Sequence, residues 1–225
     1  MKERLYFALF PRKCAACGEV IDYRHFYCEA CEQKLPYIPE ERCEYCGVEK
    51  KECACAKHKN HYESIIAPFY YEGGARHAAL KLKRYSIYAQ VLAAECVKVV
   101  RRYYASDCFD LVTAVPMRER RLRETGFNHS RALAQRIAEQ IAVPYADTLC
   151  VLYEGQAQHR LNFSLRTGNV RGIYDIIDGT DLKDKRILLV DDIKTSGATL
   201  NECALMLKLH GACSVKAVSA VVGRR

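Results

Sequence analysis

Residues 186–200 read Arg-Ile-Leu-Leu-Val-Asp-Asp-Ile-Lys-Thr-Ser-Gly-Ala-Thr-Leu. The apolar run from Ile187 to Val190 is typical of a buried strand, and a helical pattern from Leu200 to Leu209 follows it after a short turn. Two adjacent acids, Asp191 and Asp192, stand where the strand ends. A strand, two acids, a turn of small polar residues and a helix together predict one unit of an α/β sheet, with a polar site at the end of the strand.

Apolar runs and helical patterns alternate through the chain from residue 65 onward. The predicted strands are 65–71, 111–115, 187–190 and 215–222, and the predicted helices are 75–84, 87–104, 130–141 and 200–209, the last closed by Gly211. Such alternation is typical of a parallel sheet flanked by helices. We therefore expect an α/β domain over residues 58–225, with its ligand at the carboxyl ends of the strands.

The turn after the two acids carries groups suited to a phosphate. Backbone N–H groups at the start of a helix bind anions, and a glycine lets the backbone approach the ligand. Carboxylates suit sugar hydroxyls or a cation instead, so the segment predicts a ligand with a ribose diol beside a terminal phosphate. The alternative is that the acids only cap the helix after a buried strand. The residues expected to hold the phosphate are Lys194, Thr195, Ser196, Gly197, Ala198 and Thr199.

The same run resembles the phosphoribosyl-pyrophosphate motif of type I phosphoribosyltransferases, in which two acids follow a strand and a hydroxyl-rich loop holds the 5′-phosphate. The resemblance implies a type I phosphoribosyltransferase-like sheet and a reaction that passes the phosphoribosyl group to a nitrogen acceptor. Asp191 and Asp192 would then be the catalytic pair that holds the ribose hydroxyls and influences a Mg²⁺ ion bound with the substrate. No residue of the sequence stands out as a base for the acceptor.

Further segments narrow the resemblance to the competence-protein ComF family. Residues 115–128 are similar to that family's Val-Pro, basic and Arg-Gly-Phe-Asn-Gln segment, although Thr125 and His129 stand where the family usually has Arg and Gln. The Cys-rich start, the pair Leu82-Lys83 and the stretch 156–172 with Arg166, Asn169 and Val170 are also similar. For some members, the resemblance implies a role in the uptake of single-stranded DNA during natural transformation.

Four arginines follow the predicted strand 111–115, at the edge of the sheet where Asp191 is expected. A departing pyrophosphate needs several positive charges, and arginine forms paired hydrogen bonds to phosphate oxygens. Arginine runs are also common on solvated surfaces. The candidate pyrophosphate ligands are Arg118, which is nearest the strand, Arg120, Arg121 and Arg123, together with Arg166 in residues 153–171, a stretch that is either a hood over the site or a surface loop. Gly126 to Asn128 is expected to be a turn with a core aromatic.

Eight of the thirteen cysteines lie within the first 55 residues. Thiolates two residues apart can face one ion, and Zn²⁺ prefers four such ligands. The spacing predicts a structural double zinc ribbon over residues 1–57, with Cys14, Cys17, Cys28 and Cys31 around one ion and Cys43, Cys46, Cys53 and Cys55 around the other. A cross-braced pairing is the alternative. The five remaining cysteines, expected to be buried small apolar side chains, are Cys96, Cys108, Cys150, Cys203 and Cys213.

The composition is that of a globular chain, with 50% hydrophobic and 28% charged residues. The formal net charge is +8, and residues 74–136 hold the excess with thirteen basic and five acidic side chains. Eight thiolates around two Zn²⁺ would lower the total to about +4, so bulk attraction to nucleic acid would be modest. No apolar run reaches the ~18 residues of a membrane helix, and residues 1–13 lack a secretory pattern. We expect a cytoplasmic protein without membrane insertion.

Two functions of different classes follow from these features. The first is a Mg²⁺-dependent phosphoribosyltransferase that acts on phosphoribosyl pyrophosphate. The second is a non-catalytic protein that keeps the fold and associates with single-stranded DNA or with DNA-uptake proteins. Basic residues between positions 76 and 136 would contact phosphates in that case, and the candidate side chains for base stacking are Tyr85, Tyr88, Tyr103 and Tyr104.

Overall fold

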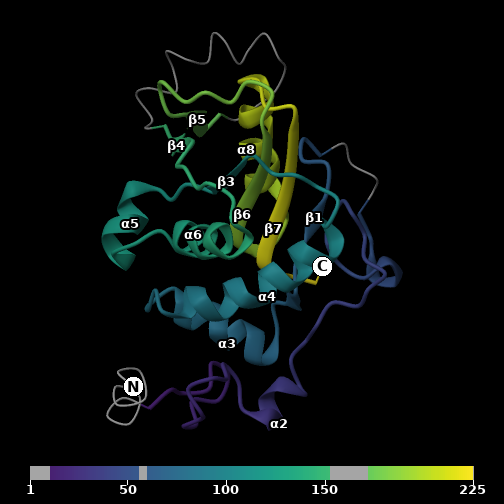
Figure 1. Ribbon diagram of the computed structural model, residues 1–225, viewed down its shortest axis with the longest axis vertical. Helices are drawn as coiled ribbons and strands as arrows, with labels where there is room; N and C mark the ends of the chain where they lie inside the picture. The colour runs from purple at the N-terminus through teal and green to yellow at the C-terminus, as the bar shows by residue number, and fades with distance from the viewer. Residues whose placement is uncertain (1–10, 56–59, 153–171, 225) are drawn as a thin grey trace.

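A parallel sheet forms the centre of the molecule. The computed structural model describes residues 11–55, 60–152 and 172–224. Within these residues, the sheet has the strand order β1-β7-β6-β3 with all pairs parallel, and β2 also pairs with β7 (Figure 1). The strands are β1 (Ile65–Ile66), β2 (Phe69–Tyr70), β3 (Leu111–Ala114), β6 (Arg186–Lys194) and β7 (Ser214–Val222). The predicted parallel sheet is confirmed.

Helices cover both faces of this sheet (Figure 1). Successive residues of β6 explain the two layers, because Leu188 and Val190 pack into the core with α3, α4 and α6, whereas Ile187 and Leu189 pack into the core with α8. A small antiparallel pair, β4 and β5, contributes to the second core. The bounds are α3 (Gly73–Leu82), α4 (Tyr88–Tyr103), α6 (His129–Ile141), α8 (Ala198–Leu209), β4 (Leu149–Val151) and β5 (Tyr174–Ile176).

The predicted strand 65–71 is wrong as one continuous element. It forms β1 and β2, which pair with β7 through Ile65 opposite Ala217 and Phe69 opposite Val221. Pro68 stands in the break, and proline has no N–H to give to a strand neighbour. Its carbonyl oxygen instead accepts from the Ile38 N–H at 2.9 Å, which joins the N-terminal segment to this edge of the sheet.

β6 is longer than the apolar run predicted. Its pairing with β7 continues to Lys194 opposite Val222, so Asp191 and Asp192 lie inside the strand rather than after it. The apolar pattern stops at Val190 because the last residues of β6 leave the fully buried part of the sheet. The backbone of both acids is therefore fixed by the sheet.

The basic segment after β3 is a helix, not the predicted loop. α5 (Glu119–Thr125) carries two ion pairs one turn apart, Arg120 with Glu124 at 3.1 Å and Arg123 with Glu119. The helix ends at Gly126, whose φ of +80° needs a glycine. The Asn128 side chain then caps α6 by accepting from the Arg131 N–H at 3.2 Å, and Phe127 packs against the core. The structural role predicted for Gly126 to Asn128 is confirmed.

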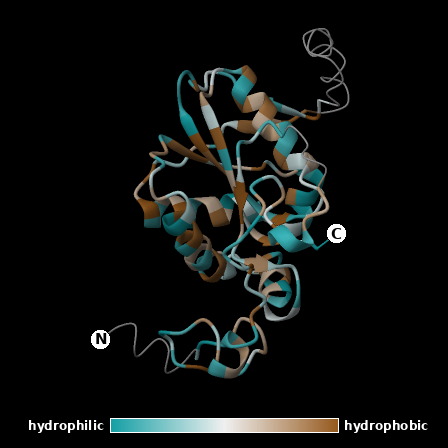
Figure 2. Cartoon of the chain, turned by 90° about the vertical axis from the view of Figure 1, so that its right-hand side faces the viewer, coloured by the Kyte–Doolittle hydropathy of each residue, from teal (hydrophilic) through white to brown (hydrophobic). Residues whose placement is uncertain are grey.

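The N-terminal segment holds its two cysteine groups on different parts of the molecule. The first group lies below α3 in a small lobe that also contains α2 (Glu29–Glu32) (Figures 1 and 2). The second group lies near η1 (Lys50–Glu52), where Val48 and Cys46 share a buried cluster with Tyr70 of β2 and Val222 of β7. The second group is thus packed directly on the edge of the sheet.

The five other cysteines do not share one environment. Cys96 and Cys203 are fully buried, as predicted, and Cys150 is half-buried. Cys108 and Cys213 are exposed, so the prediction of a buried role is wrong for these two; they lie in connections that flank strands rather than inside helices. In the described parts of the chain, no helix has both the length and the apolarity to span a bilayer.

Candidate functional site at the carboxyl edge of the sheet

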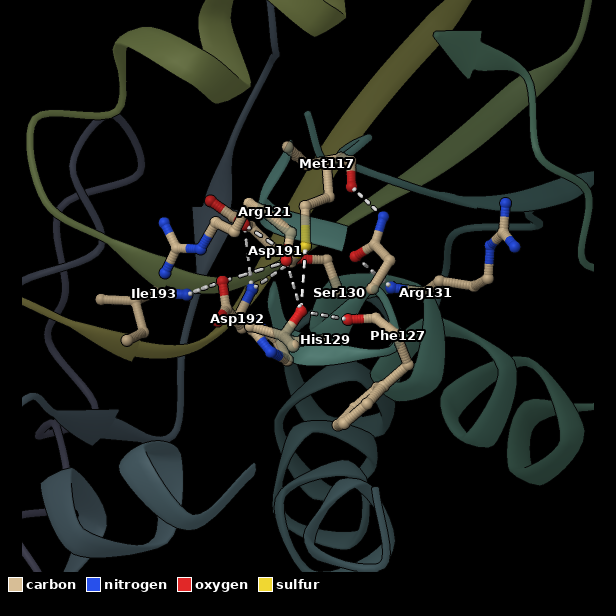
Figure 3. A network of polar contacts seen from close by, with 12 residues as sticks. Met117, Arg121, Phe127, His129, Ser130, Arg131, Asp191, Asp192 and Ile193 are labelled. Carbon is tan, nitrogen blue, oxygen red and sulfur yellow. Dashed lines mark hydrogen bonds and ion pairs between the residues drawn. The ribbon is translucent and has the colours of Figure 1, made fainter. Parts of the chain in front are cut away.

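The two acids of β6 meet the first turn of α6. The Ser130 hydroxyl oxygen lies 3.1 Å from Asp191 Oδ1 and 3.4 Å from Asp192 Oδ1, and the Asp192 N–H donates to the same hydroxyl oxygen at 3.2 Å (Figure 3). β3 ends beside them, because the Val115 N–H donates to the Val190 carbonyl at 3.0 Å. The carboxyl ends of two neighbouring strands and the start of a helix therefore converge on the acid pair.

The electrostatics of the pair favour a cation or hydroxyl donors. Asp191 is only 8% exposed. Its burial, and then the negative charge of Asp192, raise the pKa of Asp191 well above its usual range. A divalent cation or a pair of sugar hydroxyls beside these oxygens would favour the ionised form and relieve the repulsion between the two carboxylates.

His129 completes the acid site, although the sequence marked it only as a departure from a family pattern. It is 1% exposed, its Nδ1 lies 3.7 Å from Asp192 Oδ2, and its Nε2 has no hydrogen-bond partner in the part of the chain that is described. Burial lowers the pKa of His129, the Asp192 carboxylate opposes that change, and the positive charges of Arg121 and Lys83 add to it. Both cations therefore act on His129, which lies beside Asp192.

The loop between β6 and α8 is short and exposed. Gly197 has a φ of +84°, and the Ala198 N–H donates to the Ser196 hydroxyl oxygen at 3.3 Å. The first intrahelical donor is Asn201, which bonds to the Gly197 carbonyl at 2.9 Å, so the amides of Thr199 and Ala198 precede the helical ladder. This arrangement suits an anion at the start of α8.

The stem of Lys194 lies against Gly197 of the loop, but its ammonium group is bonded to the N-terminal segment. Lys194 is 3% exposed, and its Nζ donates to the Cys46 carbonyl at 2.6 Å, beside the second cysteine group. The Lys194 side chain thus contacts the zinc-ribbon segment, and the role of Lys194 in phosphate binding stays a prediction.

The arginines of the basic segment divide into two sets. Arg118, Arg120 and Arg123 line a cleft of about 1000 Å³, which has an apolar wall formed by residues such as Leu149 and Ile173. Asp191 and Asp192 are not part of its lining. Arg121 is also outside that lining and acts instead on His129 at the acid pair. Arg166 lies outside the described residues.

The eight clustered cysteines form two groups along the sequence. In each group, the four Sγ atoms lie within 4.8 Å of one another. Tetrahedral Zn–S bonds of about 2.3 Å place sulfur atoms about 3.8 Å apart. The structure has Sγ–Sγ distances of 3.8 Å for Cys17 and Cys28 and 3.6 Å for Cys46 and Cys53, with a shorter 3.0 Å between Cys53 and Cys55. The sequential pairing fits, and the donor sets suit two structural zinc ions.

Two family models match the chain. Residues 5–61 match the double zinc ribbon domain, and residues 128–225 match the phosphoribosyl transferase domain. The chain thus resembles a zinc ribbon family in its first part and a transferase family in its last part. The second match contains Ser130, Asp191 and Asp192, whereas the arginines of α5 precede it. The predicted domain boundary at residue 57 falls outside the described residues and stays a prediction.

The chain is a homologue of proteins with names that refer to DNA. It is 29% identical over 141 residues to the DNA utilization protein YhgH of Salmonella typhimurium, with 61% of each chain covered. The aligned part thus spans about three fifths of that relative's length. It is 21% identical to competence protein F of Haemophilus influenzae, covering 90% of this chain and 93% of the relative.

Among solved structures, the chain resembles the glutamine phosphoribosylpyrophosphate amidotransferase from B. subtilis. The identity is 22%, the TM-score is 0.39, and the match covers 66% of this chain and 27% of the other.

Proposed function

We propose that the phosphoribosyl transferase domain binds phosphoribosyl pyrophosphate with Mg²⁺ and transfers the phosphoribosyl group to a nitrogen acceptor. The observation that carries the proposal is the position of the buried Asp191 and the half-buried Asp192, near the end of β6 before the loop 195–197 and the start of α8. A ribose 5-phosphate carries two hydroxyls and a phosphate group, so it offers one partner for the acids and another for the loop. Open α/β sheets bind ligands at this edge.

Each part of the site has a separate task. Asp191 and Asp192 accept hydrogen bonds from the ribose hydroxyls, and Ser130 holds both carboxylates in position. The amides and hydroxyls of Thr195 to Thr199 bind the 5′-phosphate. The carboxylate oxygens fit Mg²⁺, which prefers oxygen ligands and would neutralise charge on the pyrophosphate when bound.

In the reaction, the bond between ribose C1 and a pyrophosphate oxygen breaks, and a bond from C1 to the acceptor nitrogen forms as that nitrogen loses a proton. Positive charge develops on the sugar ring, and the carboxylates below it stabilise that charge. Arg121 and Lys83, whose charges act on His129 beside the acids, are proposed to bind the departing pyrophosphate, together with Arg118 at the start of α5. Catalysis is then mainly a matter of positioning and charge.

Calorimetric titration tests this proposal. We expect the zinc-loaded chain to bind phosphoribosyl pyrophosphate in Mg²⁺ buffer, and the double variant Asp191→Asn, Asp192→Asn to lose at least about a hundredfold in affinity, or 2.7 kcal/mol or more. Arg136→Gln is a matched control, since Arg136 is exposed, paired with Glu139 and outside the candidate ligand set. Equal affinities of the wild type and the double variant would contradict the proposal.

A second function is favoured by the cleft that Arg118, Arg120 and Arg123 line. Its basic rim and apolar wall suit a phosphate backbone with flat bases, and the relatives have DNA-related names. Of the four candidate stacking tyrosines, Tyr85 is 59% exposed, but Tyr104 is buried, so the prediction of base stacking at Tyr104 is wrong.

Binding of a fluorescent oligothymidine at two salt concentrations tests this function. We expect the affinity to fall with salt and with Arg120→Gln plus Arg123→Gln, and a flat or absent response would contradict direct phosphate contact.

A further inference from the structure

The backbone of the second cysteine group binds two side chains, those of Lys194 and Tyr62, that lie against the candidate phosphate loop. Cys43 and Cys46 are separated by a tight turn that we call the second knuckle, residues 43–47. The Gly47 N–H closes this turn on the Cys43 carbonyl at 2.8 Å, and Gly47 has a φ of +78°. A metal held by both sulfur atoms fixes this turn, so it also fixes the direction of the carbonyl groups inside it.

Three consecutive carbonyls of the second knuckle accept hydrogen bonds from the rest of the chain. The Glu44 carbonyl accepts from the Ile65 N–H at the start of β1, at 2.9 Å. The Cys46 carbonyl accepts from Lys194 Nζ at 2.6 Å, and Lys194 is the last residue of β6 before the loop. The knuckle is thus bonded to two strands of the central sheet.

The middle carbonyl, that of Tyr45, makes two such bonds. It accepts from the Tyr62 hydroxyl at 2.9 Å and from Asn60 Nδ2 at 2.8 Å. Tyr62 is 3% exposed, so its side chain reaches the second knuckle from the interior of the molecule. The second knuckle therefore fixes the ends of the Lys194 and Tyr62 side chains, which would be less ordered without these hydrogen bonds.

These same two side chains form the surface on which the loop rests. A Cβ atom added to Gly197 would lie 3.1 Å from Lys194 Cε and 3.3 Å from the Tyr62 hydroxyl. The backbone of Gly197 therefore sits directly on the stem of Lys194 and the tip of Tyr62. A displacement of either side chain would shift the turn from which α8 begins.

We propose that the second knuckle is a positioning element of the phosphate site, with Lys194 and Tyr62 as the positioning residues that transmit metal occupancy of the second cysteine group to the loop 195–199. The inference rests on the proposed function of that loop. Zinc in the second group and a sugar phosphate at the loop then stabilise each other, because each favours the same position of the Gly197 turn. The coupling free energy is the same in both directions.

The first cysteine group supplies a matched control. Lys81 of α3 donates to the Ala15 carbonyl at 3.0 Å and contacts the Cys14 carbonyl at 3.4 Å, so a lysine also binds a knuckle there. Neither Lys81 nor that knuckle contacts the loop 195–199 in the described contacts. Lys81→Met and Lys194→Met therefore remove the same kind of bond, but only the second removes one that leads to the loop.

The experiment is a calorimetric titration of phosphoribosyl pyrophosphate with Mg²⁺ into the zinc-loaded full chain, as wild type, Lys194→Met and Lys81→Met. We expect Lys194→Met to keep two zinc ions per chain and to weaken binding at least about tenfold, and Lys81→Met to stay within about twofold of the wild type. Tyr62→Phe removes a single hydroxyl and is expected to weaken binding about threefold. It keeps the test open if Lys194→Met does not fold.

An equilibrium titration with a chelator gives a readout that a purely structural role would not move. In the wild type, phosphoribosyl pyrophosphate should raise the chelator concentration that removes one of the two zinc ions, and in Lys194→Met it should not. Wild-type affinity in Lys194→Met, or no effect of the ligand on zinc removal, would overturn the coupling while leaving the proposed function intact. No binding to the wild type would overturn the proposed function and, with it, the coupling.

Discussion

The two cysteine groups have the same chemistry but different neighbours. Around the first, Ala16 packs on Gly74 of α3, and Lys81 supplies the hydrogen bonds to the knuckle. Around the second, Cys46 is part of a buried cluster with Val222, the last residue of β7. The first group is attached to the outside of a helix, whereas the second is part of the sheet edge that carries the candidate phosphate loop. Cysteine spacing predicts the metal but not what the metal holds in place.

The largest expected effect separates the two groups by stability. Cys46→Ser should lower the free energy of unfolding by about 4 kcal/mol, or roughly 10 °C in Tm, because metal loss also opens the cluster at the sheet edge. Cys17→Ser should produce less than about half that shift, since Cys17 is exposed whereas Cys46 is buried. Scanning calorimetry with zinc analysis measures both. Equal shifts would remove the distinction between the groups.

A second pair of variants tests the contacts themselves. Gly197→Ala should cost about 1–2 kcal/mol, because the φ of +84° disfavours a side chain, and it should weaken phosphoribosyl pyrophosphate binding. Gly74→Ala places a Cβ 2.8 Å from Ala16 Cβ, so the first lobe should move off α3. Because alanine favours the helix by about 1 kcal/mol, overall stability should change little.

Urea unfolding and amide exchange of residues 14–31 distinguish these outcomes. Faster exchange in that lobe should accompany Gly74→Ala and not Gly197→Ala. Ligand affinity that falls with Gly74→Ala to the same extent as with Gly197→Ala would contradict the assignment of the loop to the second group alone.

The candidate ligand site should also make the free energy of unfolding depend on pH. Burial raises the pKa of Asp191, so the folded chain prefers its protonated form. The stability from this group is fully present below the ordinary carboxyl pKa of about 3.9 and is lost as the pH rises toward the raised value. Asp191→Asn should therefore raise Tm at pH 7 in Mg²⁺-free buffer, with the gain vanishing near pH 4.

Asp110→Asn gives the opposite sign and serves as its control. The Arg186 side chain lowers the pKa of Asp110, so its contribution is present above the ordinary carboxyl pKa and is lost in acid. Asp110→Asn should lower Tm slightly at neutral pH. A lower Tm of Asp191→Asn at pH 7 would show that Asp191 stabilises the fold, contrary to a carboxylate kept for a ligand.

The smallest effect is one of thiol accessibility. A maleimide reagent should label the exposed Cys108 and Cys213 in the zinc-loaded chain and leave the buried Cys96 and Cys203 unmodified. With rising chelator, Cys17 of the first group should become reactive before Cys46 of the second. Mass spectrometry of the labelled peptides gives the order in which the cysteines become reactive. Simultaneous labelling of Cys17 and Cys46 would mean that both cysteine groups hold their metal equally well.

Much of the fold follows from local pattern. Alternating apolar runs and helical periods predicted the parallel sheet, because each pattern reports a face that must be buried. The limits of β6 were missed since its last residues are polar or partly buried, and only pairing with Val221 and Val222 of β7 reveals them. The break at Pro68 was missed because apolar residues flank the proline on both sides. The helix α5 was missed because it is rich in charged residues and has no buried face that would reveal a helical period.

The candidate site was predicted in part. Asp191, Asp192 and the loop after them are adjacent in sequence, so their proximity is a local property. Ser130 and His129 come from α6, and no local pattern shows that this helix starts beside β6. The hydrogen bond from Lys194 to the Cys46 carbonyl was not predicted, because the two residues are 148 positions apart.

A crystal structure of the zinc-loaded chain soaked with phosphoribosyl pyrophosphate and Mg²⁺ tests the central claim most directly. The account predicts the ribose hydroxyls within hydrogen-bond distance of Asp191 and Asp192, and the 5′-phosphate on the amides of Thr195 to Thr199. Density for the sugar phosphate in the arginine-lined cleft beside α5, with the loop and the acid pair free, would contradict it.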